Sequence, residues 1–129
     1  MNTLTAEWVQ KAEGDLLTAQ RECAAPSKPN FDSVCFHAQQ CAEKYLKAVL
    51  TEKGISFPKT HDLSLLLRLL LPQRPAWQSL VTECNALTDS AVEVRYPGFS
   101  AHSTDAQTAL ATATQVRNAA RQALGLAAV

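Results

Sequence analysis

Apolar residues recur every three or four positions through most of this sequence, and no stretch alternates apolar and polar residues with a period of two. The pattern is clearest between residues 32 and 53, where Asp32 or Ser33 is expected to cap a helix and Gly54 to end it. Apolar side chains at this spacing form one face of a helix, which must be covered by other helices. The sequence therefore predicts an all-α fold.

Four further segments show the same helical spacing. Helices are expected at about residues 5–24, at a short stretch between residues 60 and 72, at residues 77–94, and from about residue 104 onward. Thr5 is a plausible N-cap of the first helix, Thr60 or Asp62 of the short one, and Thr104 with Gln107 resembles a capping box for the last. These segments predict a helical bundle of four long helices plus one short helix.

Length and charge limit what the chain can be. Its 129 residues suit a single domain that spans residues 1–129. Twelve acidic and twelve basic residues cancel, which excludes a strongly basic protein that binds nucleic acid over its whole surface. The N-terminus lacks the apolar stretch of a signal peptide, and the four cysteines lack metal-binding spacing. We therefore expect a cytoplasmic protein with reduced thiols and no membrane span.

One stretch, EVRYPGFSAHS at residues 93–103, interrupts the helical pattern. Pro97 and Gly98 cannot continue a helix, so the chain must turn there. Arg95 precedes this break and His102 follows it, with six residues between them. Arginine and histidine together suggest phosphate chemistry. The simpler interpretation is that Arg95 ends one helix and His102 merely precedes the next.

Three blocks of the sequence resemble the HEPN family, named for nucleotide binding in higher eukaryotes and prokaryotes. The blocks are FHAQQCAEKYLKAVL at residues 36–50, PKTHDLSLLL at residues 58–67 and AVEVRYP at residues 91–97. Asp15 and Leu16 in the first predicted helix fit the same family pattern. The blocks occur in family order and extend over about residues 12–124, so the resemblance is specific for the fold.

The resemblance implies an up-and-down helical bundle that usually forms a homodimer. Many relatives are encoded beside a small nucleotidyltransferase, in a toxin and antitoxin arrangement. Active relatives are metal-independent RNases that use an arginine, four to six intervening residues and a histidine, which correspond here to Arg95 and His102. The resemblance implies no metal and no other cofactor.

Metal-independent RNA cleavage needs a base for the 2′-hydroxyl proton and a cation for the charge that develops on the phosphoryl oxygens. His102 can be the base, because an imidazole is partly neutral near physiological pH. Arg95 can supply the cation. In a homodimer, two such pairs would provide a base from one chain and an acid from the other, as the resemblance implies.

Other residues are candidates for nucleotide or RNA contacts, each with a structural alternative. They are Tyr96, Lys44, His61, Arg117 and Arg121. His61 is also explained by helix capping, and Lys44, with Glu43 and Lys47, by a charged outer helix face.

Arg117 and Arg121 lie one turn apart, opposite an alanine-rich face, and form the candidate basic patch for an RNA backbone. Asp15 lies beside an apolar stripe and is expected to form an intramolecular ion pair, for instance with an arginine. His37 and Cys41 could share a zinc ion, but no further ligands have suitable spacing, and a core thiol is favoured.

Two functions from different classes fit these residues. The first is the helical component of a two-gene HEPN and nucleotidyltransferase module that cleaves RNA through Arg95 and His102. The alternative is a binding module without catalysis, which docks the nucleotidyltransferase or holds a nucleotide between helices. A homodimeric domain without any nucleotide role is a third possibility.

Overall fold

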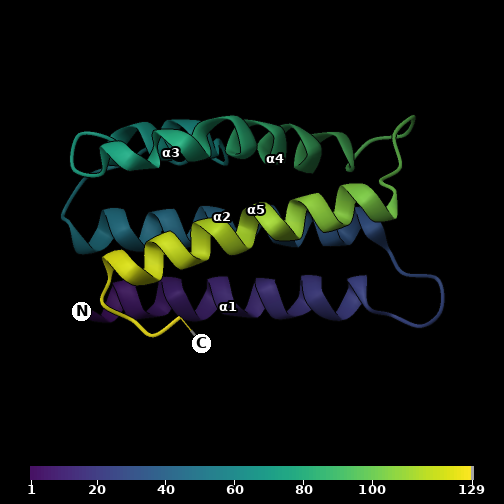
Figure 1. Cartoon of the computed structure of the whole chain (residues 1–129), viewed down its shortest axis with the longest axis horizontal. Coiled ribbons are helices and arrows are strands. Elements are labelled where there is room, and N and C mark those ends of the chain that lie inside the picture. The colour runs from purple at the N-terminus through teal and green to yellow at the C-terminus, as the bar shows by residue number, and fades with distance from the viewer. Residues whose placement is uncertain (129) are drawn as a thin grey trace.

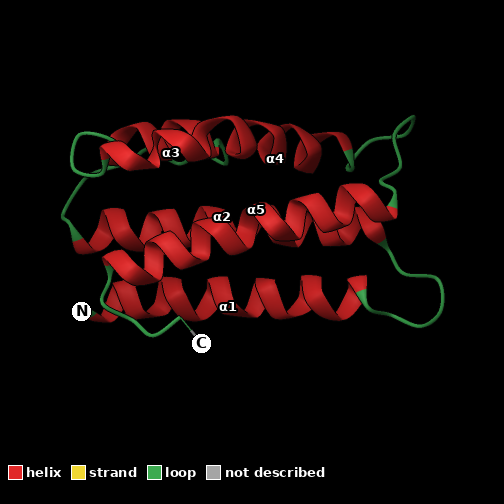
Figure 2. Ribbon diagram, in the orientation of Figure 1, coloured by secondary structure: helices red, strands yellow, loops and turns green. Residues whose placement is uncertain are grey.

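The computed structural model of the chain describes residues 1–128, which contain helices and loops but no strand. In chain order the elements are α1 (Thr3–Cys23), α2 (Phe31–Glu52), α3 (Leu63–Leu70), the 3₁₀ helix η1 (Pro75–Leu80), α4 (Val81–Glu93) and α5 (Ser103–Ala123). Four α-helices are long and α3 is short, which confirms the predicted bundle. Figure 2 shows that the loops gather at the two ends of the bundle.

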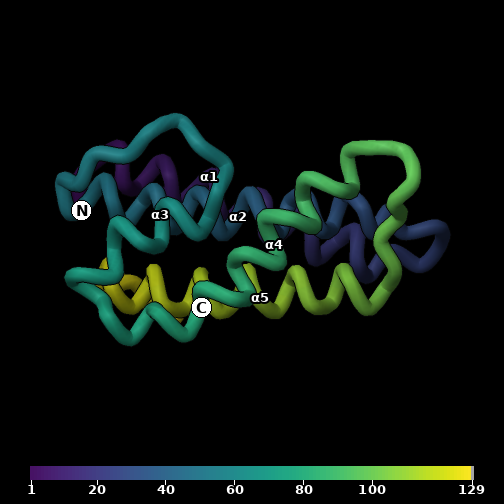
Figure 3. Tube along the Cα trace, turned by 90° about the horizontal axis from the view of Figure 1, so that it is seen from above, coloured from purple at the N-terminus to yellow at the C-terminus, as the bar shows by residue number. Residues whose placement is uncertain are grey.

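Helix α2 lies at the centre and contacts each of the other four α-helices. In Figure 1, α1 lies on one side of the bundle, α2 and α5 form the middle, and α3 and α4 lie on the other side. Seen from above in Figure 3, α4 runs obliquely over this middle layer. The central position of α2 explains why its sequence shows the clearest apolar stripe.

The core draws on all five α-helices, and most of its largest buried side chains come from α2 and α3. Tyr45, Leu46 and Leu50 of α2 are almost fully buried, together with four of the six leucines of α3, Leu63, Leu66, Leu67 and Leu70. Burying each such side chain contributes roughly 1.5–3 kcal/mol relative to leaving it exposed. The short α3 therefore stabilises the fold through its apolar side chains.

Two helices begin slightly earlier than the sequence predicted. The side chains of Asn2 and Asn30 cap α1 and α2, and their Oδ1 atoms accept hydrogen bonds from the main-chain nitrogens of Thr5 (2.8 Å) and Ser33 (3.1 Å). Thr5 and Asp32 therefore do not act as the predicted caps, because an asparagine stands before each of them. The predicted cap of α3 is confirmed, since Asp62 Oδ1 lies 3.0 Å from the nitrogen of Ser64.

The predicted fourth helix is divided into η1 and α4. Trp77 and Leu80 are three residues apart, a spacing that a 3₁₀ helix places on one face. Cys84, Leu87 and Ala91 continue with the spacing of an α-helix and are buried. An apolar pattern of threes and fours does not distinguish one long helix from these two.

The cysteines within the described residues are unpaired. Cys41 and Cys84 are buried, as their places on apolar helix faces predicted, and Cys35 is buried as well, whereas Cys23 is only partly buried. Burial raises the pKa of the Cys41 thiol to about 12 and that of Cys84 to about 11. None of the helices in residues 1–128 is both long enough and apolar enough to cross a membrane.

Candidate functional site

The segment of residues 94–102 connects α4 to α5 and carries the predicted chemistry. After α4, the main-chain nitrogens of Arg95 and Tyr96 still donate to the carbonyls of Val92 and Glu93, each over 3.2 Å. Gly98 then adopts a φ of +95°, which L side chains rarely tolerate, and the chain reverses. The sequence RYPG therefore brings Arg95 to the end of a helix and exposes the residues that follow.

Arg95 rests on an aromatic side chain of α2. Its Cζ atom lies 5.1 Å from the centre of the Phe36 ring, a distance at which a guanidinium is attracted to the ring face. No carboxylate within residues 1–128 forms an ion pair with Arg95. The positive charge is held in place by Phe36 without being neutralised, which is the condition needed to bind a phosphate.

His102 is the N-cap of α5, and its side chain is largely exposed to solvent. Its imidazole is 85% exposed, and its main-chain nitrogen donates to Asp105 Oδ2 over 2.8 Å. The Nδ1 atom lies 3.5 Å from the same carboxylate oxygen, so the second ring nitrogen, Nε2, is left open. A histidine oriented in this way can exchange a proton with a bound ligand.

The predicted capping box at Thr104 and Gln107 is wrong by two residues. Helix α5 begins at Ser103, so Thr104 already lies inside its first turn. The main-chain nitrogen of His102 instead bonds Asp105, while the amide of Gln107 donates to Ser103 Oγ over 3.3 Å. The candidate base is therefore itself the capping residue, which fixes its backbone at the helix entrance.

The segment is anchored to α2 near both of its ends. Arg95 stacks on Phe36, and the main-chain nitrogen of Ala101 donates to Asp32 Oδ1 over 2.7 Å. Asp32 and Phe36 are four residues apart on α2 and therefore lie on one face of that helix. These contacts place Arg95 and His102 at the same end of the bundle, but no hydrogen bond within the described residues joins them.

Lys44 is engaged with α1. Its Nζ atom lies 2.5 Å from Asp15 Oδ2, and His37 Nδ1 lies 2.9 Å from Asp15 Oδ1. The predicted ion pair of Asp15 therefore exists, but its partner is Lys44 rather than an arginine, and His37 adds a hydrogen bond. Because Asp15 is 13% exposed, this contact ties α1 to α2 under partial exclusion of water.

His61 contacts a second carboxylate, Glu43, which is the centre of a buried polar cluster, while the His61 side chain itself is 68% exposed. Glu43 accepts from Lys47 Nζ over 2.9 Å and from Gln39 Nε2 over 3.1 Å, and His61 Nδ1 lies 2.8 Å from its Oε1. Burial by itself raises the pKa of Glu43, but the hydrogen bonds from Lys47, His61 and Gln39 outweigh it, so the pKa lies below its usual value.

The predicted charged outer face of α2 is wrong for two of its residues. Glu43 is 3% exposed and Lys47 is 8% exposed, because α3 and the loop before it cover this part of α2. Glu43 and Lys47 instead form an ion pair with each other across one helical turn. The side chain of Lys47 also lies over the rings of Trp8 and Phe57, at 5.6 and 5.9 Å from their centres.

Arg117 and Arg121 do not form the open basic patch that the sequence predicted. Their side chains are 13% and 12% exposed, because Glu13 of α1 and Tyr45 of α2 face them. Arg117 Nε donates to Glu13 Oε2 over 2.7 Å, and Arg121 Nη1 donates to the Tyr45 hydroxyl over 3.1 Å. Both guanidinium groups also bind main-chain carbonyls of residues 127 and 128. The charges of Arg117 and Arg121 therefore help to hold α5 against α1 and α2.

The pKa values of this cluster follow from its contacts. Burial raises the pKa of Tyr45 to about 12, and its hydrogen bond to Glu13 adds to the effect. Burial also opposes ionisation of Glu13, but hydrogen bonds from Arg117 and Tyr45 outweigh it and keep its pKa below the usual range. At neutral pH, Glu13 is therefore ionised and Tyr45 is protonated, and the hydrogen bond to Glu13 raises the pKa of Arg117.

The zinc hypothesis for His37 and Cys41 has little chemical support. Cys41 is fully buried in the apolar core, and a tetrahedral zinc site needs more ligands than these two residues. His37 already binds Asp15 through Nδ1, and no group of three metal-binding side chains gathers within residues 1–128.

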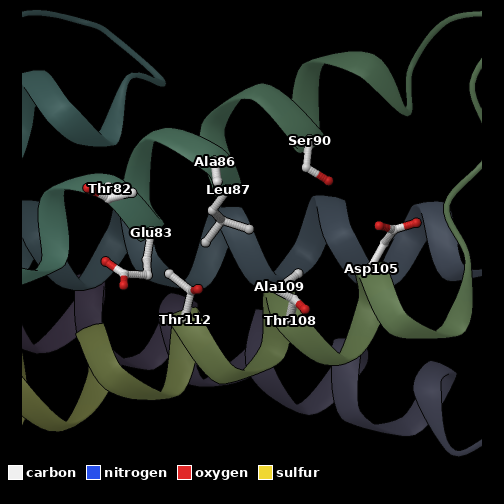
Figure 4. A pocket seen from close by; sticks show the side chains of 9 residues that line it. All are labelled: Thr82, Glu83, Ala86, Leu87, Ser90, Asp105, Thr108, Ala109 and Thr112. Atoms are coloured by element: carbon white, nitrogen blue, oxygen red, sulfur yellow. The ribbon is translucent and has the colours of Figure 1, made fainter.

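A groove of about 280 Å³ separates α4 from α5 beside the candidate site. Figure 4 shows Ser90 and Asp105 at one end of this groove and Glu83 near the other, with threonine hydroxyls along the wall. No lysine or arginine lines it. Two carboxylates would repel a phosphate, so the groove is a poor site for RNA compared with the neighbouring segment that carries Arg95.

Sequence reasoning did not identify Phe36 and Asp32 as supports of the site. Both lie on α2, about 60 to 70 residues before the segment they hold. Their spacing of four residues signals a common helix face, but nothing local shows what that face contacts. Tyr96, also a candidate, is 63% exposed at the turn.

Comparison with protein families identifies one match. The model of the HEPN domain matches residues 5–123, which is nearly the whole chain. This family comprises nucleotide-binding and RNase-type domains. Comparison with curated proteins gives no match, and comparison with solved structures gives none either.

Proposed function

The chain belongs to the HEPN domain family, and on this premise we propose that it is a metal-independent endoribonuclease that acts through Arg95 and His102. We further propose that it is the helical component of a two-gene module whose other product is a small nucleotidyltransferase. One observation carries the proposal. The segment of residues 94–102 holds an unneutralised guanidinium at one end and an 85% exposed imidazole at the other.

The reaction follows from the chemistry of these two side chains. Nε2 of a neutral His102 accepts the proton of the RNA 2′-hydroxyl, and the 2′-oxygen forms a bond to the adjacent phosphorus. Arg95 binds the phosphoryl oxygens, where negative charge increases in the transition state. The bond from phosphorus to the 5′-oxygen breaks, and a protonated histidine donates its proton to that oxygen. The products are a 2′,3′-cyclic phosphate and a 5′-hydroxyl.

The need for two histidines supports a homodimer. Within one chain, Arg95 rests on Phe36 while His102 contacts Asp105, and no hydrogen bond joins the two groups. A second copy of the chain, placed with its own segment opposite, would supply the proton donor. We therefore expect the rate of cleavage per molecule to fall when the protein is diluted below the concentration at which it forms dimers.

The test is cleavage of labelled single-stranded RNA by the purified protein in EDTA. We expect fragments with 2′,3′-cyclic phosphate ends and no cleavage of the matching 2′-O-methyl RNA, which lacks the attacking hydroxyl. The proposal requires both cleavage in EDTA and the dependence of that cleavage on the 2′-hydroxyl. Cleavage that appears only with added divalent metal, or none at all, contradicts the proposal.

A second candidate function is docking of the nucleotidyltransferase without catalysis. It is favoured by two exposed apolar side chains beside Arg95, since Val92 is 49% exposed and Tyr96 is 63% exposed. Exposed apolar groups near an arginine are typical of protein interfaces. In this case the partner co-purifies with the chain, Tyr96→Ala prevents co-purification, and no EDTA-resistant cleavage occurs.

A further inference from the structure

His37 lies beside the proposed site but has no part in the chemistry described above. Its Nδ1 atom is 2.9 Å from Asp15 Oδ1, and the other carboxylate oxygen of Asp15 binds Lys44 over 2.5 Å. A carboxylate bound at Nδ1 fixes the orientation of an imidazole and determines which ring nitrogen faces outward. Asp15 therefore positions His37 with Nε2 as its free nitrogen.

The Nε2 atom of His37 reaches solvent. The side chain is 29% exposed, and Nε2 has no hydrogen-bond partner within residues 1–128. Within the described chain, the buried side-chain polar atoms without a hydrogen-bond partner are Trp8 Nε1 and Ser64 Oγ. Nε2 of His37 is therefore not buried. A ring nitrogen that is neither buried nor bonded is available to a ligand.

Phe36 connects this histidine to Arg95. The Phe36 and His37 rings are 5.3 Å apart and nearly perpendicular, and the Arg95 Cζ atom lies 5.1 Å from the Phe36 ring. Arg95 Cζ therefore lies no farther from the centre of the His37 ring than the sum of these two distances. Neighbouring backbone groups of one RNA strand can bridge such a distance.

The local charge also suits a nucleic-acid backbone. Asp15 carries the one carboxylate in contact with His37, and Lys44 neutralises it. Arg95 has no ion-pair partner within the described chain. The strip formed by Arg95, Phe36 and His37 therefore carries the charge of Arg95, with the Asp32 carboxylate one turn of α2 away, whereas the groove between α4 and α5 is lined by Glu83 and Asp105 and by no lysine or arginine.

We propose that His37 is an RNA-contacting residue, whose imidazolium form donates a hydrogen bond from Nε2 to a phosphate oxygen of single-stranded RNA next to the phosphate that Arg95 holds. This inference rests on the proposed function, because it takes Arg95 to be a phosphate ligand. In it, Asp15 is a positioning residue, and the RNA strand crosses the first turns of α2 beside Phe36.

The variant His37→Asn separates this role from a purely structural one. The asparagine amide can donate to Asp15 from about the place of Nδ1, but it has nothing at the place of Nε2. The matched control is His61→Asn. His61 also binds a carboxylate through Nδ1, but its partner Glu43 belongs to the buried cluster, and the contact helps hold the loop before α3.

The measurement is the affinity of a fluorescent 2′-O-methyl RNA of mixed sequence, determined by anisotropy in EDTA at fixed salt. This RNA cannot be cleaved, so binding is measured separately from catalysis. We expect His37→Asn to weaken binding about tenfold with an unchanged melting temperature, and His61→Asn to leave binding unchanged.

The outcomes distinguish the two proposals. If the native protein binds the RNA and His37→Asn binds it equally well, His37 is structural and the inference is overturned, while the proposed function stands. If the native protein does not bind the RNA at all, both fail.

A second measurement uses the native protein and does not depend on how the variant folds. The chain has three histidines, so its ring Cε1 proton signals can be assigned from three single variants. On addition of the same RNA, we expect the His37 signal to shift and the His61 signal to stay in place. A His37 signal that does not move at RNA saturation contradicts the inference.

Discussion

Two polar regions of this molecule differ in whether their charged side chains are paired with partners. The cluster around Glu43 buries a carboxylate and satisfies it with Lys47, Gln39 and His61. The segment of residues 94–102 leaves the Arg95 charge unneutralised and the His102 ring in solvent. Buried, fully bonded groups hold helices together, whereas open groups can meet a ligand. The Glu43 cluster therefore belongs to the scaffold, whereas the chemistry that we propose lies where the helical pattern breaks.

The largest expected effect is on stability, from Glu43→Ala. This change leaves Lys47 buried without its carboxylate, so we expect the free energy of unfolding to fall by about 3–5 kcal/mol. Urea unfolding at pH 7, followed by circular dichroism, measures it. A loss below about 1 kcal/mol would show that the cluster is not a structural element, and it would contradict the difference drawn between the two regions.

Acid should weaken the scaffold through the same residue. The pKa of Glu43 is lower in the folded protein than in the unfolded chain, so its contribution is complete above the unfolded value, near 4.5, and is lost as the pH falls through the folded value. We expect the native protein to lose more stability than Glu43→Gln between pH 6 and pH 3. Parallel losses in urea titrations at both pH values would contradict this assignment.

A smaller effect is expected from Gly98→Ala, which strains the turn of the exposed segment. The φ of +95° disfavours any residue with a Cβ, so the free energy of unfolding should fall by about 1 kcal/mol. Nothing lies within 4 Å of the added atom, so the cost comes from the backbone alone. Thermal unfolding measures it, and a more stable variant would show that the turn does not require glycine.

The smallest change in stability is expected from Arg95→Ala and His102→Ala. Arg95 loses its contact with Phe36, and His102 loses a weak contact with Asp105 through an 85% exposed ring. Each variant should unfold within about 1 kcal/mol of the native protein. A loss comparable to that of Glu43→Ala would mean that these residues also belong to the scaffold.

Much of the fold could be predicted from the sequence, because apolar spacing determines which helix faces are buried. Helix starts were less accurate, because asparagine, aspartate and threonine are all good N-caps, and the sequence alone does not show that Asn2 and Asn30 cap α1 and α2. The pattern also could not separate η1 from α4. These are local ambiguities, and none of them changed the bundle.

The candidate site was predictable only in part. Arg95 and His102 are marked by the break in the helical pattern, but the supports of the site depend on how the helices align. Asp15 and Lys44 are 29 residues apart, and Arg117 and Glu13 are 104 apart. Whether a lysine or arginine is open or paired is decided by such distant partners. The sequence therefore showed which side chains are cationic, but it could not show that Arg117 and Arg121 are paired within the bundle.

The most direct measurement compares two variants, His102→Ala and Glu43→Gln, for RNA cleavage in EDTA per folded molecule. A proton-transfer residue contributes roughly 100-fold or more to the rate, so His102→Ala should lose at least that factor while keeping its melting temperature. Glu43→Gln should keep its rate and melt at a lower temperature. If His102→Ala cleaves RNA as fast as the native protein, the exposed segment is not the catalytic site, and the account is wrong.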